Sequence, residues 1–416
     1  MDADAAAGRV RTLLEELCRE YAVPGAQVGL LDGTGRVVVC HGTTAVGDDA
    51  RPVTASTAFH AGSVAKSLAG LLVHDAARAG LVHLDVPCAD QADGLWDDTP
   101  RSIMAQVTGR PNLLPEPDET LEEFAARTAD LPRVHPPGRF SYCNAGWPVL
   151  DLLLRRRTGS SFEQLAARAL GAGTTFGMPP AAARGHGAAP GTAPVPVPST
   201  YSDAASAAGS RWWATADQLL DYAALHLQDG AGRFHPEDVR ALRAPHAPVP
   251  GATVSDSWGA GWALWDRGSH QAFGWAGYTG GHRAYLRCFP REEAAVVVLA
   301  NCAGPLFGPP GGSALFDALL PDLLDALGVP ALPEPELPGP RTPAAVLAGT
   351  FGPVELSADG DDALLLAAQA FGEQAPLRFT RVTADTFARQ GRPPGGMTIA
   401  VDADLLYLGP FAVART

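Results

Sequence analysis

Residues 59–68 read FHAGSVAKSL, and a long apolar run follows them. Ser63 and Lys66 stand three positions apart, so a helix that begins at the serine places both side chains on one face, within hydrogen-bonding reach. A serine hydroxyl becomes a good nucleophile when a neighbouring base takes its proton, and an amine with a lowered pKa is such a base. The spacing therefore predicts a Ser-Lys catalytic pair; the alternative is a capping serine followed by a solvated lysine.

Lys66 is the single lysine among the 31 basic residues of the chain, and every other one is an arginine. A guanidinium keeps its proton under ordinary conditions, whereas a desolvated lysine loses its proton readily. The run from 66 to 79 is apolar around most of a helix, which predicts a buried central helix. A nucleophile at the start of such a helix benefits from the helix dipole and from unpaired N–H groups.

Composition and charge exclude several classes of function. The 416 residues, 46% hydrophobic, are typical of a globular protein with more than one domain. The formal charge of -14 argues against nucleic acid and anionic membrane surfaces as partners. The acidic N-terminus lacks the features of a secretory signal, and the six scattered cysteines indicate free thiols, so we expect a cytoplasmic protein. The histidines show no metal-ligand spacing, and we expect no metal and no cofactor.

Helical spacing at 5–20 and two strand-like runs at 25–31 and 36–40, around an Asp-Gly-Thr-Gly turn, predict an antiparallel sheet covered by helices. A strand at 294–300 and a helix at 313–327 follow later in the chain.

The segment 328–343 contains six prolines and is typical of a stiff linker. Short alternating runs after it predict a small β domain. We therefore expect a catalytic domain at 1–327, a linker at 328–343 and a β domain at 344–416, with a loop or flap at 179–200.

Two further stretches carry candidate site residues. Tyr142 and Asn144 precede a helix expected from 147 to 157, and in an extended segment their side chains share one side, where a phenol and an amide can serve a reacting acyl group. The alternative is a tyrosine packed in the core and an asparagine that caps the helix. The Gly-rich run 273–281 contains Trp275, Gly277 and Tyr278, and glycines in a strand permit close approach of the backbone to a ligand.

Taken in order, Ser63-x-x-Lys66, Tyr142-x-Asn144 and the Gly-rich strand resemble the three motifs of the serine β-lactamase and penicillin-binding protein superfamily. The class C branch, with its carboxylesterases and penicillin-binding-protein-type thioesterases, is the most similar. The resemblance implies an α+β fold, in which a five-stranded antiparallel sheet is flanked by helices beside a helical lobe. The β tail resembles the lipocalin-like appendix of some members.

The resemblance also implies roles for these residues. Ser63 would be the acylated nucleophile, Lys66 its base and Tyr142 the second acid/base, while Asn144 would orient the substrate carbonyl or amide. The third motif, usually Lys-Thr-Gly or His-x-Gly, departs from the pattern. It is either Trp275-Ala276-Gly277, the register we prefer, or Tyr278-Thr279-Gly280.

In the preferred register the backbone N–H groups of Ser63 and Tyr278 would hold the oxyanion. The missing cationic side chain argues against penicillins and free D-peptides as physiological substrates.

These features predict an intracellular serine acyl-enzyme catalyst, an esterase or transacylase that moves an acyl group from an ester or thioester to an amine or water. Its partners would be a small-molecule acyl donor and, for a transacylase, an amine acceptor; we expect a role in natural-product tailoring. The alternative is a penicillin-binding-protein-type thioesterase or peptide cyclase, or a D-aminopeptidase-like hydrolase. A lesser alternative is a non-catalytic ligand-binding homologue.

Overall fold

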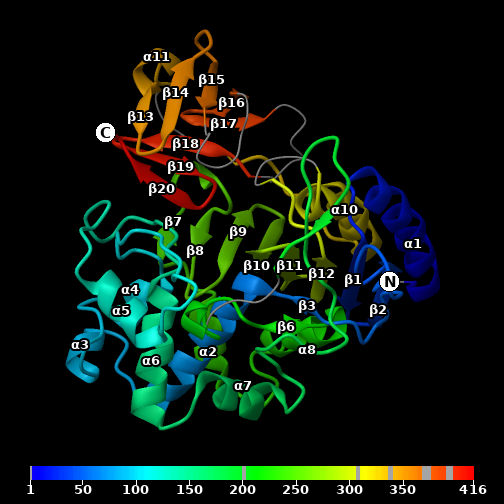
Figure 1. Ribbon diagram of the computed structural model, residues 1–416, viewed down its shortest axis with the longest axis horizontal. Coiled ribbons are helices and arrows are strands. Elements are labelled where there is room, and N and C mark those ends of the chain that lie inside the picture. Colours follow the sequence, from blue (N-terminus) through cyan, green and yellow to red (C-terminus); the bar gives the residue numbers. More distant parts are fainter. Residues whose placement is uncertain (1, 199–202, 306–309, 336–340, 368–375, 390–396) are drawn as a thin grey trace.

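A computed structural model describes residues 2–198, 203–305, 310–335, 341–367, 376–389 and 397–416. Figure 1 shows a large α+β part and, next to the end of its sheet that carries β7 and β8, a smaller part built from strands β13–β20. No helix within the described ranges is long and apolar enough to cross a bilayer. All six cysteines are free, as predicted.

The large part is organised around one antiparallel sheet in the strand order β2-β1-β12-β11-β10-β9-β8-β7. The hairpin predicted from the Asp-Gly-Thr-Gly turn is present, and Asp32 pairs with Gly35 at its tip. The α+β class is confirmed, but the sheet has eight strands where the resemblance implied five. The bounds are β1 Gly25–Asp32, β2 Gly35–Gly42, β7 Ala247–Pro248, β8 Ser257–Trp258, β9 Ala263–Arg267, β10 His270–Thr279, β11 His282–Phe289 and β12 Ala294–Ala300.

Helices cover both faces of this sheet, so its central strands are buried on both sides. Strand β12 is apolar at every position: its even-numbered residues pack in the core shared with α1 (Ala3–Glu20) and α10 (Gly312–Leu327). Its odd-numbered residues pack in the core shared with α8 (Ala216–Leu227) and the helical lobe. Because side chains alternate along a strand, a continuous apolar run is what a doubly covered strand requires.

The helical lobe contains α2, the helix predicted to be buried. It spans Ala65–Arg78, and Leu68, Leu71 and Val73 have no exposed surface. A 3₁₀ turn, η1 (Gly62–Val64), leads into it from the short strand β3 (Phe59–His60), which pairs with β6 (Trp213–Ala214). The remaining helices are α3 Cys88–Gln91, α4 Pro100–Met104, α5 Leu121–Ala129, α6 Gly146–Thr158, α7 Phe162–Leu170 and α9 Pro236–Leu242, with 3₁₀ turns η2 Asp203–Ala205 and η3 Pro250–Ala252.

The C-terminal part is a meander of strands in the order β13 to β20 and has a hydrophobic core of its own. A bridge between Phe351 and Arg415, with a hydrogen bond of 3.0 Å from the Thr416 N–H to the Thr350 carbonyl, brings the first and last strands together as a near-barrel. The bounds are α11 Ala344–Leu347, β13 Gly349–Phe351, β14 Val354–Ala358, β15 Ala363–Ala367, β16 Leu377–Thr383, β17 Thr386–Arg389, β18 Ile399–Asp402, β19 Leu405–Leu408 and β20 Phe411–Ala414.

Two predicted connecting segments are only partly described. Residues 336–340 of the predicted linker lie outside the described residues. The predicted loop at 179–200 contains the paired two-residue strands β4 (His186–Gly187) and β5 (Val195–Pro196), and its last two positions also lie outside the description.

Candidate active site

Ser63 and Lys66 meet at the junction of η1 and α2. The Lys66 ammonium Nζ donates a hydrogen bond of 3.0 Å to the Ser63 hydroxyl Oγ and another of 2.7 Å to the backbone carbonyl of Gly209. The serine lies in the 3₁₀ turn and the lysine in the first turn of α2, so the two side chains share one face as the spacing predicted. A general base in direct contact with a hydroxyl is the geometry that activates a serine nucleophile.

The surroundings of Lys66 favour its neutral form. Its side chain is completely buried, and its hydrogen bonds within the described ranges go to the Ser63 hydroxyl and the Gly209 carbonyl rather than to a carboxylate. Burial lowers the pKa of Lys66 from its ordinary value to about 7, because a charged amine loses its hydration there. The interpretation of Lys66 as a solvated lysine is therefore wrong. Near neutral pH a large fraction of these amines are free of the proton and able to accept one.

Tyr142 completes a cluster of three reactive side chains. It is 3% exposed, its hydroxyl is hydrogen-bonded to Ser63, and its hydroxyl oxygen accepts a bond of 3.2 Å from the indole N–H of Trp275. Lys66 Nζ lies 5.3 Å from the centre of the tyrosine ring. Burial raises the pKa of Tyr142 well above its usual range, and the hydrogen bonds offset only part of that rise. The phenol keeps its proton at neutral pH and is able to donate it.

Strand β10 brings the third motif against the turn that holds Ser63. A side-chain carbon added at Gly277 would lie 2.1 Å from the carbonyl oxygen of Ala61, so only glycine allows this approach. Trp275 contacts Tyr142, whereas the Tyr278 side chain is 48% exposed and its hydroxyl donates to the Gly304 carbonyl. The contacts support the register Trp275-Ala276-Gly277. The role of the Tyr278 N–H in holding an oxyanion stays a prediction.

Asn144 is held by a neighbouring loop. Its backbone N–H and its side-chain amide both donate to the Oδ1 atom of Asn112, at 2.9 and 3.0 Å. It does not cap the following helix, because the N-cap of α6 is Ala145 and no side chain caps it. Among the described contacts no hydrogen bond joins Asn144 to Ser63 or Lys66. Its expected role toward a substrate carbonyl or amide stays a prediction.

Comparison with known proteins now identifies the family. The sequence model of the Beta-lactamase family matches residues 10–318 of the chain. The protein belongs to the Beta-lactamase family. Penicillin-binding protein 4 of Amycolatopsis lactamdurans is 29% identical over 383 residues, covering 81% of this chain and 95% of that protein. The recognised superfamily, a family of serine hydrolases, is thus confirmed.

Solved structures of the family extend the likeness to the whole chain. The crystal structure of SurE is 27% identical with a TM-score of 0.76, and 99% of each chain is covered. A structure of SurE with D-Leu is 25% identical with a TM-score of 0.73, covering 99% of this chain and 100% of that one. A class C β-lactamase has a TM-score of 0.64 at 17% identity, over 74% of this chain and 94% of that one. Because the SurE match spans the β13–β20 strands, that chain also has a counterpart of the β part.

The structure adds residues around Lys66 that the sequence prediction missed. The carbonyl of Gly209, which accepts from Lys66, follows a turn in which the Ser206 hydroxyl accepts from the Ala208 N–H at 3.0 Å. That hydroxyl donates to the buried carboxylate of Asp151 on α6 at 2.7 Å. Asp151 is a lone acidic residue inside the apolar run 147–154, and this pattern predicts a buried carboxylate with a polar partner. A backbone carbonyl has no comparable signal.

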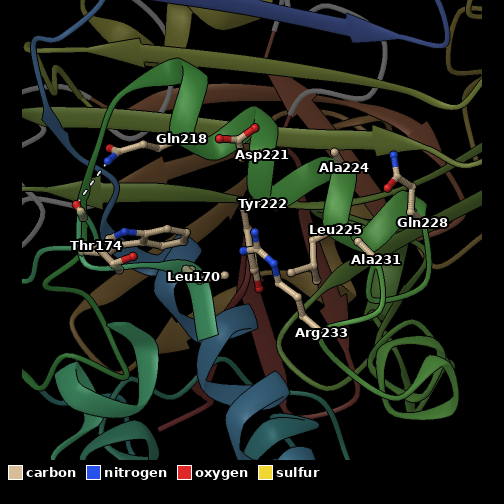
Figure 2. A pocket seen from close by; sticks show the side chains of 12 residues that line it. Leu170, Thr174, Gln218, Asp221, Tyr222, Ala224, Leu225, Gln228, Ala231 and Arg233 are labelled. Carbon is tan, nitrogen blue, oxygen red and sulfur yellow. Dashed lines mark hydrogen bonds between the residues drawn. The ribbon is translucent and has the colours of Figure 1, made fainter. Parts of the chain in front are cut away.

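A cavity of about 450 Å³ is lined without any contribution from Ser63. Figure 2 shows it along α8, where Gln218 donates a hydrogen bond of 3.2 Å to Gly173. Its lining includes Tyr222, whose hydroxyl donates to the hydroxyl of Ser67, next to Lys66 in α2. None of Ser63, Lys66 and Tyr142 lines it.

Proposed function

We propose that the protein is a serine acyl-enzyme catalyst that takes an acyl group from an ester or thioester and passes it to an amine or to water. The observation that carries the proposal is the fully buried Lys66, the one lysine of the chain, with its Nζ 3.0 Å from Ser63 Oγ. A desolvated titratable group held against a nucleophilic side chain is characteristic of catalytic sites.

In the acylation half-reaction, Ser63 Oγ attacks the carbonyl carbon of the donor while the neutral Lys66 amine takes the hydroxyl proton. The bond from that carbon to the leaving oxygen or sulfur then breaks, and Tyr142 donates a proton to the leaving group. The Lys66 ammonium returns its proton to Tyr142 directly or through a water molecule. The products are an acyl-serine, a free alcohol or thiol, and both catalytic groups in their starting forms.

Deacylation reverses these roles. Tyr142 first passes its proton to Lys66, directly or through a water molecule, and the tyrosinate then takes the proton of the amine nitrogen or water oxygen that attacks the acyl-serine carbon. The bond to Ser63 Oγ breaks, and the Lys66 ammonium returns its proton to the serine oxygen, so all three groups end in their starting forms. The N–H groups of Ser63 and Tyr278 are the proposed donors to the oxyanion in both halves, where one such donor typically contributes roughly 3–4 kcal/mol.

The wall around the reacting atoms favours an acyl donor of low charge. Trp275 occupies the position where family members usually carry a cation, and its ring packs against Trp258 and Tyr142. A carboxylate on the donor therefore lacks its usual partner at this position, which argues against penicillins as physiological substrates. The crystal structure of SurE with D-Leu supports a D-amino-acid unit in one of the two substrates. The second candidate function is therefore a thioesterase or peptide cyclase whose acyl donor contains a D-amino-acid unit. A role in natural-product tailoring fits this candidate as well as the esterase or transacylase.

The test uses an N-acetyl-D-leucyl thioester and the matching aryl ester, each with and without an added amine. We expect a mass increase by one acyl group on Ser63 in the intact protein, loss of that adduct in Ser63→Ala, and an amide product when amine is present. Hydrolysis alone would assign an esterase. Absence of an acyl-Ser63 adduct with both donors would contradict the proposal, and full ligand binding by the Ser63→Ala variant would then favour the non-catalytic alternative.

A further inference from the structure

The segment that carries Tyr142 is attached to the β part at several successive positions. The Tyr142 N–H donates to the carbonyl of Pro410 at 3.1 Å. Two residues earlier, the Phe140 carbonyl accepts from the Tyr407 hydroxyl at 3.0 Å. Before that, the Arg139 guanidinium pairs with the carboxylates of Asp402 and Asp404, at 2.9 and 3.2 Å.

These partners come from two neighbouring turns of the β part. Asp402 and Asp404 lie at the turn between β18 and β19, and Pro410 lies in the turn between β19 and β20. Residues 140–144 belong to no helix or strand of the large part, so the main-chain N–H of Tyr142 has no ladder partner there. The β part provides that partner instead, and a strained or mobile backbone at Tyr142 would displace its hydroxyl.

The same turn also places an aromatic ring against the tyrosine. The ring of Phe411 meets the Tyr142 ring edge-on, with centroids 5.7 Å apart. Trp258 and Trp275 lie at similar distances, 5.8 and 5.4 Å, but both belong to the large part. Phe411 packs with the hydrophobic core of the large part rather than with that of the β part. It is half-buried.

We propose that the Pro410–Phe411 turn of the β part is a positioning element for Tyr142, which holds the backbone of that residue and shields its ring from water. The inference rests on the proposed function, in which Tyr142 transfers the proton. It assigns a role in the reaction to a segment that lies outside the residues matched by the family model.

If Phe411 shields Tyr142, the rate of acylation at high pH depends on the Phe411 side chain. Desolvation is the main cause of the raised pKa of Tyr142, and removal of a neighbouring ring admits water. The pKa then falls toward the ordinary value of about 10 for a phenol, and the proton donor is lost at a lower pH. A residue that stabilised only the β part would not change this profile.

The experiment measures acyl-Ser63 formation from the aryl ester, across neutral to alkaline pH, in the full chain and in four variants. For Phe411→Ala we expect roughly tenfold slower acylation at saturating donor, an unchanged KM, and an alkaline decline that begins at lower pH than in the wild type. Phe411→Leu keeps an apolar side chain and shows the same changes more weakly. Phe411→Tyr keeps the ring and restores both rate and profile.

Val413→Ala is the matched control. This side chain lies in the same strand but packs against the β part's own core. We expect it to lower the stability of the protein and to leave acylation and its pH profile as they are. Wild-type profiles in both Phe411→Ala and Phe411→Leu would overturn the inference. If the wild type itself forms no acyl-serine, the proposed function fails and this inference fails with it.

Discussion

The indole N–H of Trp275 donates a hydrogen bond of 3.2 Å to the hydroxyl oxygen of Tyr142. Because this bond occupies a lone pair of the oxygen, the tyrosine proton is directed away from the indole, and the hydroxyl is also bonded to Ser63. In the register Trp275-Ala276-Gly277, a neutral donor takes the position of the usual cation. It orients the proton without adding a charge to the cluster.

The first prediction concerns that indole. Trp275→Phe retains an aromatic ring but removes the N–H, and we expect kcat/KM for acylation to fall by roughly tenfold, the worth of one hydrogen bond of about 1.4 kcal/mol. Steady-state kinetics with the aryl ester measure the effect. Trp265→Phe is the control, since that indole lies in the same sheet beneath the Arg287 guanidinium and away from Tyr142. Equal kinetics in both variants would show that the bond has no part in the reaction.

A second prediction separates the charge of Lys66 from its ability to lose a proton. Lys66→Arg keeps the charge but cannot deprotonate, so we expect it to be nearly as damaging as Lys66→Ala, with acylation slower by roughly 10²–10⁴-fold in both. The rate of adduct formation by intact-protein mass spectrometry is the readout. Circular dichroism verifies that both variants fold. An arginine variant with near wild-type acylation would refute Lys66 as the base.

The third prediction follows from the pKa of Lys66, which burial lowers to about 7. The base acts in its neutral form, so the acylation rate should increase as pH rises through about 7 and level off above it. Pre-steady-state measurement of kcat/KM against pH gives the midpoint. A midpoint near the ordinary lysine value of about 10.4 would contradict the desolvated state of Lys66.

Sequence patterns determined those parts of this structure that depend on neighbours along the chain. The hairpin at 25–42, the buried helix after Ser63 and the Ser63–Lys66 contact all follow from local spacing. The Lys66–Gly209 bond joins positions 143 apart, and the acceptor is a main-chain carbonyl that any residue type provides. The Phe411–Tyr142 contact is likewise long-range, and a phenylalanine in an alternating strand gives no sign that it leaves its own core.

The fourth prediction concerns Asp151, which is buried on α6 and bonded to Ser206 and Arg155 at 2.7 and 2.6 Å. Asp151→Ala leaves the Ser206 hydroxyl without its buried acceptor, so we expect the free energy of unfolding to fall by about 1–3 kcal/mol. Acylation should slow as well, since the turn that carries the Gly209 carbonyl loses its anchor. Urea unfolding and adduct formation measure the two effects. Ser210→Ala, which removes a half-buried hydroxyl that donates to the Ala205 carbonyl in the same loop, serves as control.

The last prediction concerns acid stability and the buried His282. Neither ring nitrogen has a hydrogen-bond partner among the described residues, and burial, with His60 and His186 nearby, lowers its pKa well below the usual value. Because the unfolded chain binds the proton at a higher pH than the folded one, stability is lost as pH falls from about 6.5 toward the folded-state value, by up to about 1.4 kcal/mol per pH unit. Above about pH 6.5 the group is neutral in both states and has no such effect.

His282→Phe should therefore reduce the loss of stability between about pH 7.5 and pH 5 that urea unfolding measures in the wild type. The exposed His83, changed to Asn, is the matched control and should leave that loss unchanged. For each variant we compare the free energy of unfolding at the two pH values and use the difference between them. A packing defect at His282 lowers the free energy of unfolding equally at both pH values, so it cancels in this difference. An identical acid slope in His282→Phe and the wild type would show that His282 is not the residue that resists protonation.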